Sequence, residues 1–363
     1  MKNLHEKKMI VPRMRVEVTE EQCRAISRAF RNKHISSGDD IGKLEAELKS
    51  LFGKTYCFLT VNGFSAIFLA LAAMGLKGYK VLLPAVSTCF SIFHAVKASG
   101  NIPVLADVNE NDFNMACSSA ENIVLSEDVA AIISPNHAGI LSDVRGLKKM
   151  NVPVIEDCAQ SFLSNAGLET VADFQTFSFY PTKMINGIDG GALLTSDPHM
   201  GERIADIGSY AHQTRVDDAI RYNMKMPNLH AALCLIDVAR WKDKRERIDE
   251  VVSAYDAVLG KFEGVRRVGS DSIAKSCLYK YIIVFDSPDI KSSVEGRLHS
   301  RGIECAREYI ALWARGKNTY PNASKLLAST FSIPLYEAIS DEEVSYVCEC
   351  LEQALGETFC ART

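Results

Sequence analysis

The chain has 363 residues, of which 47% are hydrophobic and 24% are charged, and its formal net charge is -4. It lacks the basic excess of a nucleic-acid-binding protein and the long single-sign runs of a membrane-surface segment. No apolar stretch approaches the ~18 residues of a membrane span, and the N-terminus lacks the apolar core of a signal peptide. We expect a cytoplasmic protein with one large domain and a smaller one.

Eleven cysteines are scattered along the chain. The close pair Cys348 and Cys350 falls on a predicted C-terminal helix with no histidine partner, which is a poor signal for zinc. Scattered cysteines without a secretion signal favour reduced thiols. We therefore expect no metal site.

The chain opens with two predicted amphipathic helices and a strand. Residues 19–32 begin with a threonine cap and early glutamates, and residues 41–51 repeat apolar side chains at helical spacing. Residues 56–61 form a short apolar strand that runs into the turn Asn62-Gly63-Phe64-Ser65, after which a strongly helical stretch begins. A strand feeding a glycine turn at a helix start favours an anion such as phosphate, because free N–H groups and the helix dipole both attract it. An ordinary strand-to-helix turn is the alternative.

Further apolar runs alternate with predicted helices, which indicates an α/β fold with a mostly parallel sheet. The predicted strands are residues 80–88, 102–108, 129–139 and 152–160, with a strand pair within 176–197. In such sheets ligands bind at the carboxyl ends of the strands. Asn62, His137 and Asp157 all fall at such ends, although His137 could equally serve only to satisfy backbone groups.

Two stretches carry the chemistry. VIEDCAQSF at 154–162 ends an apolar run in a carboxylate, Asp157, and FSFYPTK at 177–183 delivers Lys183 into a glycine-rich turn. Pyridoxal phosphate (PLP) chemistry requires this pair, because a lysine forms a Schiff base with the cofactor aldehyde and a carboxylate keeps the pyridine nitrogen protonated. A surface lysine is the alternative interpretation of Lys183.

The last part of the chain predicts a second unit. Residues 221–259 begin with polar side chains and become a long charged helix, which we expect to form a spine between the domains. Beyond it, strands at 278–285 and 331–336 and helices at 294–303 and 340–355 predict a compact α+β piece. We expect a large domain at 1–245, including the N-terminal helical segment, and a small domain at 246–363.

The motifs follow one another in a recognisable order: N-G-F-S-A-I-x-L-A-L, P-V-L-A-D-V, V-I-E-D-C-A-Q-S, F-S-F-Y-P-T-K-x(5)-D-G-G and R-Y-N-M-K-M. This order resembles the DegT/DnrJ/EryC1/StrS family of PLP-dependent aminotransferases. The likeness runs from residues 35–38 to residues 332–344. It implies the aspartate-aminotransferase-like fold type I and amino transfer to keto-sugars, mostly nucleotide-linked.

The resemblance implies the catalytic residues and the reaction. Lys183 matches the lysine that binds the cofactor covalently, Asp157 matches the partner of the pyridinium nitrogen, and Gln160 matches a residue packed against the cofactor ring. The family's usual amino donor is L-glutamate. We therefore expect transfer of an amino group from an amino acid to a keto-sugar in amino-sugar biosynthesis.

The resemblance also implies how the cofactor phosphate is held. Gly63, Phe64 and Ser65 match the phosphate turn, and Ser178 matches a further phosphate ligand. Asn223 matches an asparagine that reaches the cofactor phosphate of the neighbouring subunit. The expected assembly is therefore a homodimer with shared active sites.

The chain departs from the family pattern in several places. Phe64 stands where a threonine is usual, and the ring that normally stacks on the cofactor falls on Cys89 or Phe90, because segment 84–91 carries an inserted residue. The remaining departures are a contracted turn at residues 137–139, Lys225 in place of arginine, and an unrecognisable tyrosine–proline–histidine segment around residues 307–309. Cofactor chemistry is expected to be intact, and the substrate-facing parts are expected to be divergent.

Two alternatives to a sugar aminotransferase stay open. One is an aminotransferase for a non-sugar ketone such as a cyclitol, and the other is a PLP-binding protein with a regulatory or partner-binding role and weak chemistry. A dehydratase branch of the family replaces the lysine with histidine, and the presence of Lys183 argues against that branch.

Overall fold

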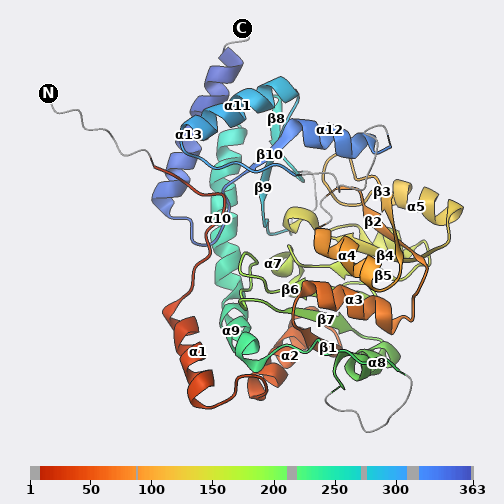
Figure 1. Ribbon diagram of the computed structural model, residues 1–363. Helices are drawn as coiled ribbons and strands as arrows, with labels where there is room; N and C mark the ends of the chain where they lie inside the picture. The colour runs from red at the N-terminus through yellow and green to blue at the C-terminus, as the bar shows by residue number, and fades with distance from the viewer. Residues whose placement is uncertain (1–8, 87–88, 211–218, 271–275, 309–318, 361–363) are drawn as a thin grey trace.

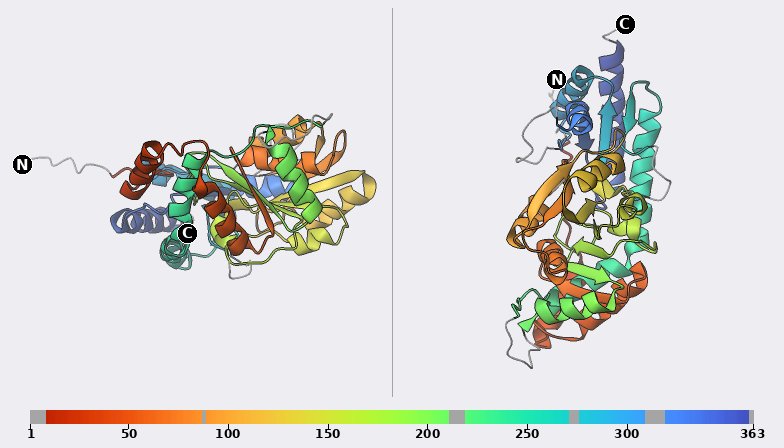
Figure 2. Two further views of the ribbon diagram at one scale, coloured as in Figure 1. Left: turned by 90° about the horizontal axis from the view of Figure 1, so that it is seen from below. Right: turned by 90° about the vertical axis from the view of Figure 1, so that its right-hand side faces the viewer.

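A large unit and a smaller unit are stacked end to end, and one long helix runs alongside both (Figures 1 and 2). The computed structural model describes residues 9–86, 89–210, 219–270, 276–308 and 319–360. Within these ranges, no helix combines the length and the apolar character needed to cross a membrane.

The large unit is built on a seven-stranded sheet with strand order β1-β7-β6-β5-β4-β2-β3. Its strands are β1 (Tyr56–Thr60), β2 (Lys80–Pro84), β3 (Ile102–Ala106), β4 (Val129–Pro135), β5 (Val154–Asp157), β6 (Phe174–Ser178) and β7 (Gly191–Thr195). Strands β3, β2, β4, β5 and β6 pair in parallel, and β7 pairs antiparallel with β6 and β1. The predicted α/β fold with a mostly parallel sheet is confirmed. The final two residues of the predicted strand at 80–88 lie outside the described residues.

Alternating side chains of the central strands reach two different cores, as a strand's period of two requires. Val81 and Ile155 pack with helices α3 (Gly63–Ala73), α4 (Phe90–Ala98) and α8 (Pro198–Gly208) on one face. Their neighbours Leu82 and Val154 pack with α5 (Cys117–Ser126) and α6 (Val144–Lys148) on the other face. Because both faces are covered, the strands are mostly apolar, with a few buried polar side chains such as Glu156 on β5 and Gln175 on β6.

The small unit is an antiparallel three-stranded sheet with order β10-β9-β8, covered by helices. Its elements are β8 (Val265–Arg267), β9 (Tyr281–Phe285), β10 (Thr330–Ile333), α11 (Pro288–Ser300), α12 (Pro321–Ser329) and α13 (Asp341–Cys360). The predicted strands at 278–285 and 331–336 and the predicted helices at 294–303 and 340–355 correspond to β9, β10, α11 and α13.

The long charged helix predicted within 221–259 is present, but it covers only the second half of that range. The chain forms α9 (Asn228–Ala239) and α10 (Trp241–Leu259), because the backbone at Arg240 (φ -104, ψ 13) leaves the α-helical region. Helix α10 is nevertheless the spine beside both units (Figure 1). It continues through residue 246 without interruption, so the division of the chain at that point stays a prediction.

The N-terminal segment joins the two units. Helix α1 (Glu20–Arg31) has the predicted Thr19 cap, completed by a capping box with Gln22, and α2 (Asp39–Phe52) follows. The residues before α1 lie against the small unit, where Val11 bridges Ile303. The N-terminal segment therefore contacts both units.

A turn after β4 forms the tightest contact between the units. The 3-10 turn η1 (His137–Gly139) lies against residues 277–280, and the Tyr279 N–H donates to the Ala138 carbonyl at 2.8 Å. Gly139 has φ +87, and a Cβ atom there would lie 2.2 Å from the Cys277 carbonyl oxygen. Glycine is thus required at this turn by both its conformation and its surroundings.

Gly139→Ala tests this contact, with Gly78→Ala as a matched control. Gly78 also has a positive φ (+82), but nothing lies within 4 Å of its Cβ position. The unfolding free energy of the control should therefore fall only by the cost of placing alanine at a positive φ, about 1–2 kcal/mol. Gly139→Ala should lose about 2 kcal/mol more, because the Cys277 backbone must move. Urea unfolding measures both losses, and equal losses would show that the Cys277 backbone moves away from the added methyl group at little cost in free energy.

Candidate active site

Three cavities meet at the turn after β6. The Asp157 cavity, of about 410 Å³, is lined by Asp157, Gly63 and Ser178 among others. The Arg15 cavity, of about 230 Å³, and the Arg13 cavity, of about 250 Å³, lie toward the small unit. Thr182 lines all three, and Lys183 lines the Asp157 and Arg15 cavities. The predicted lysine turn is therefore the junction of the site.

Asp157 ends β5 and is buried, with 7% of its surface exposed. Its Oδ1 accepts the Ala159 N–H at 3.0 Å and the Thr176 hydroxyl at 3.4 Å. Thr176 is its register partner on β6, which explains the second contact. Burial raises the pKa of Asp157, while the Ala159 N–H, the Lys183 charge and the Thr176 hydroxyl act in the opposite direction. A cationic group in the cavity would favour the ionised carboxylate.

Gly63 and Ser178 form a close-fitting corner at the start of α3. Asn62 caps this helix, and its Oδ1 accepts both the N–H and the hydroxyl of Ser65 at 2.9 Å. The N–H groups of Gly63 and Phe64 are the first of the helix and have no intrahelical acceptor. A Cβ atom on Gly63 would lie 2.9 Å from the Ser178 Cβ. Glycine thus keeps space open for an anion at this helix terminus.

Lys183 projects from a turn whose backbone is fixed. Its N–H donates to the Tyr180 carbonyl at 2.8 Å, and its Nζ lies 5.0 Å from the centre of the Tyr279 ring. Tyr279 comes from the small unit and donates from its hydroxyl to the Thr182 Oγ1 at 3.3 Å. Within the described residues, Lys183 has no carboxylate at ion-pair distance, so its amine is available to a ligand.

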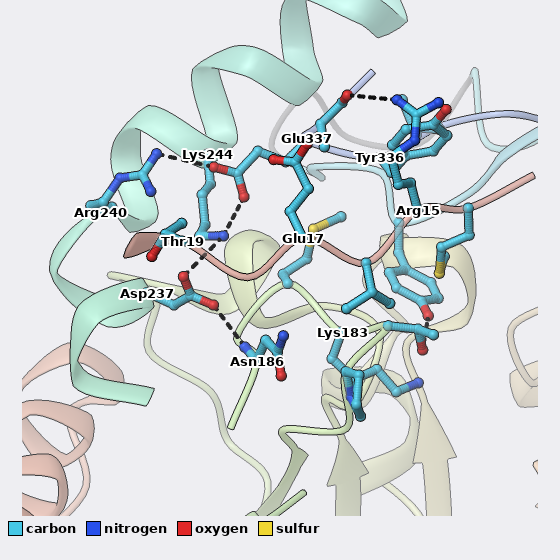
Figure 3. A pocket seen from close by; sticks show the side chains of 18 of the residues that line it. Arg15, Glu17, Thr19, Lys183, Asn186, Asp237, Arg240, Lys244, Tyr336 and Glu337 are labelled. Carbon is cyan, nitrogen blue, oxygen red and sulfur yellow. Dashed lines mark hydrogen bonds and ion pairs between the residues drawn. The ribbon is translucent and has the colours of Figure 1, made fainter. Parts of the chain in front are cut away.

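A chain of charged contacts anchors the lysine loop, residues 179–190 between β6 and β7, to the small unit (Figure 3). The Asn186 N–H donates to Asp237 Oδ2 at 2.8 Å, and Asp237 Oδ1 lies 3.3 Å from the Lys244 Nζ. Lys244 also binds Glu337, which accepts from Arg240 at 3.2 Å. Asp237 and Lys244 are buried, so each charge depends on its partners. The contacts cross the break between α9 and α10.

Turn η1 forms another wall of the Asp157 cavity. The Ala138 N–H donates to Gln160 Oε1 at 2.8 Å, which fixes the Gln160 side chain. His137 is 2% exposed, and its Nε2 lies 3.6 Å from Glu308 Oε2 of the small unit. Burial lowers the pKa of His137 to about 4, although the Glu308 carboxylate acts in the opposite direction. The imidazole is therefore neutral at pH 7.

The Asp157 cavity fits PLP in three respects. The corner at Gly63 and Ser178 leaves room for a phosphate that a Cβ atom would fill. Asp157 is a buried carboxylate placed to bind a protonated ring nitrogen, and Lys183, which has no carboxylate partner among the described residues, lines the same cavity. These three groups supply the phosphate, ring and aldehyde contacts that the cofactor requires.

The structure gathers most of the predicted site residues on this one cavity. Its lining includes Gly63, Phe64, Cys89, Asp157, Gln160, Ser178 and Lys183. Ser65 turns toward Asn62, and Phe90 and Asn223 are exposed and outside the lining. Asn223 lies beside Ser209, and these three assignments stay predictions.

Two residues of the site were not predicted. Thr176 binds Asp157, and Thr182 lines all three cavities. Thr176 precedes Ser178 by two positions on β6, so the strand period could have placed both side chains on one face. Thr182 adjoins Lys183, but only the packing of Tyr279 shows its central position.

Comparisons with known proteins give a consistent result. The model of the DegT/DnrJ/EryC1/StrS aminotransferase family matches residues 16–352. The GDP-perosamine synthase of Escherichia coli O157:H7 is 24% identical, covering 94% of this chain and 98% of that protein. The UDP-2-acetamido-2-deoxy-3-oxo-D-glucuronate aminotransferase of Pseudomonas aeruginosa is 25% identical, covering 90% and 94%. The crystal structure of NtdA from Bacillus subtilis with bound cofactor PMP superimposes with a TM-score of 0.85 at 19% identity, covering 96% and 85%.

His137→Gln should flatten the pH dependence of stability. The lowered pKa of His137, about 4 against an ordinary 6.5, means that the unfolded chain binds more protons between these values. Wild-type stability should therefore fall from pH 6.5 toward pH 4, by up to about 3 kcal/mol, and stay level below pH 4 for this residue. Urea unfolding at pH 7 and pH 5 measures the change. His94→Gln, which removes an exposed imidazole, is the control, and an identical pH response of the two variants would contradict the prediction.

Proposed function

The chain belongs to the DegT/DnrJ/EryC1/StrS aminotransferase family, and on this basis we propose that it transfers an amino group from L-glutamate to a nucleotide-linked keto-sugar, with PLP as cofactor. The observation that carries the proposal is the placement of Lys183 and Asp157 on one cavity that also contains the Gly63–Ser178 corner. The names of the Escherichia coli and Pseudomonas relatives refer to nucleotide sugars, which supports this class of acceptor. Such an acceptor is consistent with a cytoplasmic enzyme.

The chain's own residues account for the proton movements that amino transfer requires. When bound, PLP supplies an aldehyde that condenses with amines and a ring that withdraws electrons from the adjacent carbon. Lys183 Nζ holds the cofactor and, once released, takes the proton from the Cα of the amino donor. Asp157 keeps the ring nitrogen protonated, and Thr176 and the Ala159 N–H hold its carboxylate in place. In the second half of the reaction, the same groups return a proton to the acceptor carbon.

A homodimer with shared active sites is part of the proposal. Asn223 is exposed on the large unit and lies outside the Asp157 cavity of its own chain. Phe90, Tyr180 and Ile188 are exposed apolar side chains on elements near that cavity, and a second copy would cover them. This arrangement would bring Asn223 to the phosphate corner of the partner.

Replacing the lysine should abolish amino transfer without unfolding the protein. Borohydride reduction of the wild-type holoenzyme should fix the cofactor covalently to Lys183, as peptide mass spectrometry can verify. Lys183→Arg should lose the adduct and lower the rate of cofactor conversion by L-glutamate at least about 1,000-fold, because the covalent link and the proton acceptor are both removed. Lys242→Arg, on the exposed side of α10, is the control.

The outcome also separates the proposed function from its rivals. If the wild-type protein forms the adduct but no amino donor converts its cofactor, a PLP-binding regulatory role is favoured. Conversion by L-glutamate followed by turnover with a keto-cyclitol, but with no nucleotide-linked keto-sugar, would favour the non-sugar aminotransferase.

Mixing two inactive variants tests the shared site. Lys183→Ala and Asn223→Ala should each be impaired alone, because one lacks the cofactor-binding amine and the other a phosphate contact. In a mixed dimer, Lys183 from one chain and Asn223 from the other would form one complete site. Up to about a quarter of wild-type activity should return on mixing, since half of the dimers are mixed and each has one intact site. No recovery, despite subunit exchange shown by mass spectrometry, would contradict the shared site.

A further inference from the structure

The Arg13 cavity opens directly beside the cofactor site. Gln160 and Thr182 line both this cavity and the Asp157 cavity. Tyr279 also lines it, and the Tyr279 ring centre is 5.0 Å from the Lys183 Nζ. A small molecule that reaches the reactive amine can therefore extend a substituent into the Arg13 cavity. The proposed function does not assign this space.

Cations predominate on the walls of this cavity. Arg13, Lys280 and Arg307 line it, whereas Glu308 is its only carboxylate among the described lining residues. Lys280 Nζ lies 2.6 Å from Glu308 Oε1, so these two charges offset each other. The guanidinium of Arg307 makes two hydrogen bonds to Glu295, at 2.7 and 2.6 Å, and is likewise compensated.

Arg13 is the uncompensated cation of the group. Its backbone N–H donates to Glu304 Oε2 at 3.0 Å, but across the described part of the chain its guanidinium has no carboxylate at ion-pair distance. Burial raises the pKa of Glu308, but the charges of Lys280 and the more distant Arg13 act in the opposite direction, and the pKa lies below its ordinary value, so this carboxylate is ionised. With Lys280 and Glu308 cancelling, the cavity keeps one net positive charge.

We propose that the Arg13 cavity is a carboxylate-binding subsite, with Arg13 as the residue that binds the substrate carboxylate. A guanidinium matches a carboxylate with two parallel hydrogen bonds, which gives orientation as well as affinity. The inference rests on the proposed function for the identity of the neighbouring reactive site. The carboxylate belongs either to the amino-acid donor or to an acceptor such as a uronate, and the two sources share this chemistry.

Glu308 limits the affinity of the subsite. Its ionised carboxylate lies on the same cavity as the incoming anion, and two like charges in a partly buried space repel each other. Lys280 offsets this repulsion without removing it. Neutralising Glu308 should therefore strengthen carboxylate binding, whereas removing Arg13 should weaken it.

Glutarate tests the subsite without any chemistry, because it carries two carboxylates and no amine. Titration calorimetry on the PLP-loaded protein should show that Arg13→Ala weakens glutarate binding about 10- to 100-fold, as the loss of charge-assisted hydrogen bonds predicts. Arg301→Ala is the matched control, because the Arg301 guanidinium already binds Glu357 at 2.7 Å and Arg301 lines none of the three cavities. The control should bind glutarate as the wild type does.

A second variant moves affinity in the opposite direction. Glu308→Gln keeps the shape of the side chain and should tighten glutarate binding several-fold. Glu308 is nearly buried between Lys280 and His137, so circular dichroism is used to check that the variant folds. If this variant misfolds, the comparison of Arg13→Ala with Arg301→Ala still decides the question.

Three substrates identify the source of the carboxylate. The preference of the wild type for L-glutamate over L-glutamine should shrink in Arg13→Ala if the side-chain carboxylate of the donor is bound. The preference for L-glutamate over L-isoglutamine should shrink in Arg13→Ala if the α-carboxylate of the donor is bound. A defect confined to the acceptor half-reaction assigns the carboxylate to the acceptor.

The proposal is overturned if wild-type protein does not bind glutarate, or if Arg13→Ala binds it as tightly as wild type or Arg301→Ala does. Failure of the proposed function is recognised separately, by absence of cofactor conversion with every amino donor while glutarate binding still depends on Arg13. Glutarate binding and amino transfer thus give independent answers.

Discussion

One residue of turn η1, Ala138, couples the cofactor site to the small unit. The N–H of Ala138 donates to Gln160 at 2.8 Å, and its carbonyl accepts the N–H of Tyr279 at 2.8 Å. At the next position, Gly139, any side chain would clash with the backbone of Cys277. The position of Gln160 and the position of the small unit are therefore set by the same short turn. A displacement of the small unit would therefore also displace Gln160, because the closely packed backbone of the turn transmits the movement.

A second coupling runs through charges on the opposite side of Lys183. Asp237 holds the N–H of Asn186 in the lysine loop, and Lys244 joins Asp237 to Glu337 of the small unit. The two couplings bracket Lys183 and Tyr279. Buried charged contacts of this kind add little net stability, but they specify one arrangement, since an unpaired buried charge is costly. These contacts hold the loop that carries the lysine, as the proton transfer proposed for Lys183 requires.

Much of the fold and the core of the site could be predicted from the sequence. The predicted strands of the large sheet, the Thr19 cap, and the positions of Asp157 and Lys183 depend on local patterns, and the structure has them where expected. The long helix within 221–259 was predicted, but the break at Arg240 that separates it from α9 was not; this break lies beside the charged contacts of Asp237 and Lys244. The hydroxyl of Ser65 was expected near the phosphate, but it is taken up by the helix cap at Asn62.

The sequence by itself determined that a carboxylate ends one strand and that a lysine lies in the glycine-rich turn after the next, because strand ends and turns follow from periodicity and glycine positions. Only the tertiary structure decided what surrounds them. Arg13, Lys280 and Glu308 meet Gln160 on one cavity although they come from distant parts of the chain. Their meeting depends on how the N-terminal segment and the small unit pack against turn η1. Such contacts between remote segments have no period or local motif, so substrate-facing geometry appears only when the units are assembled.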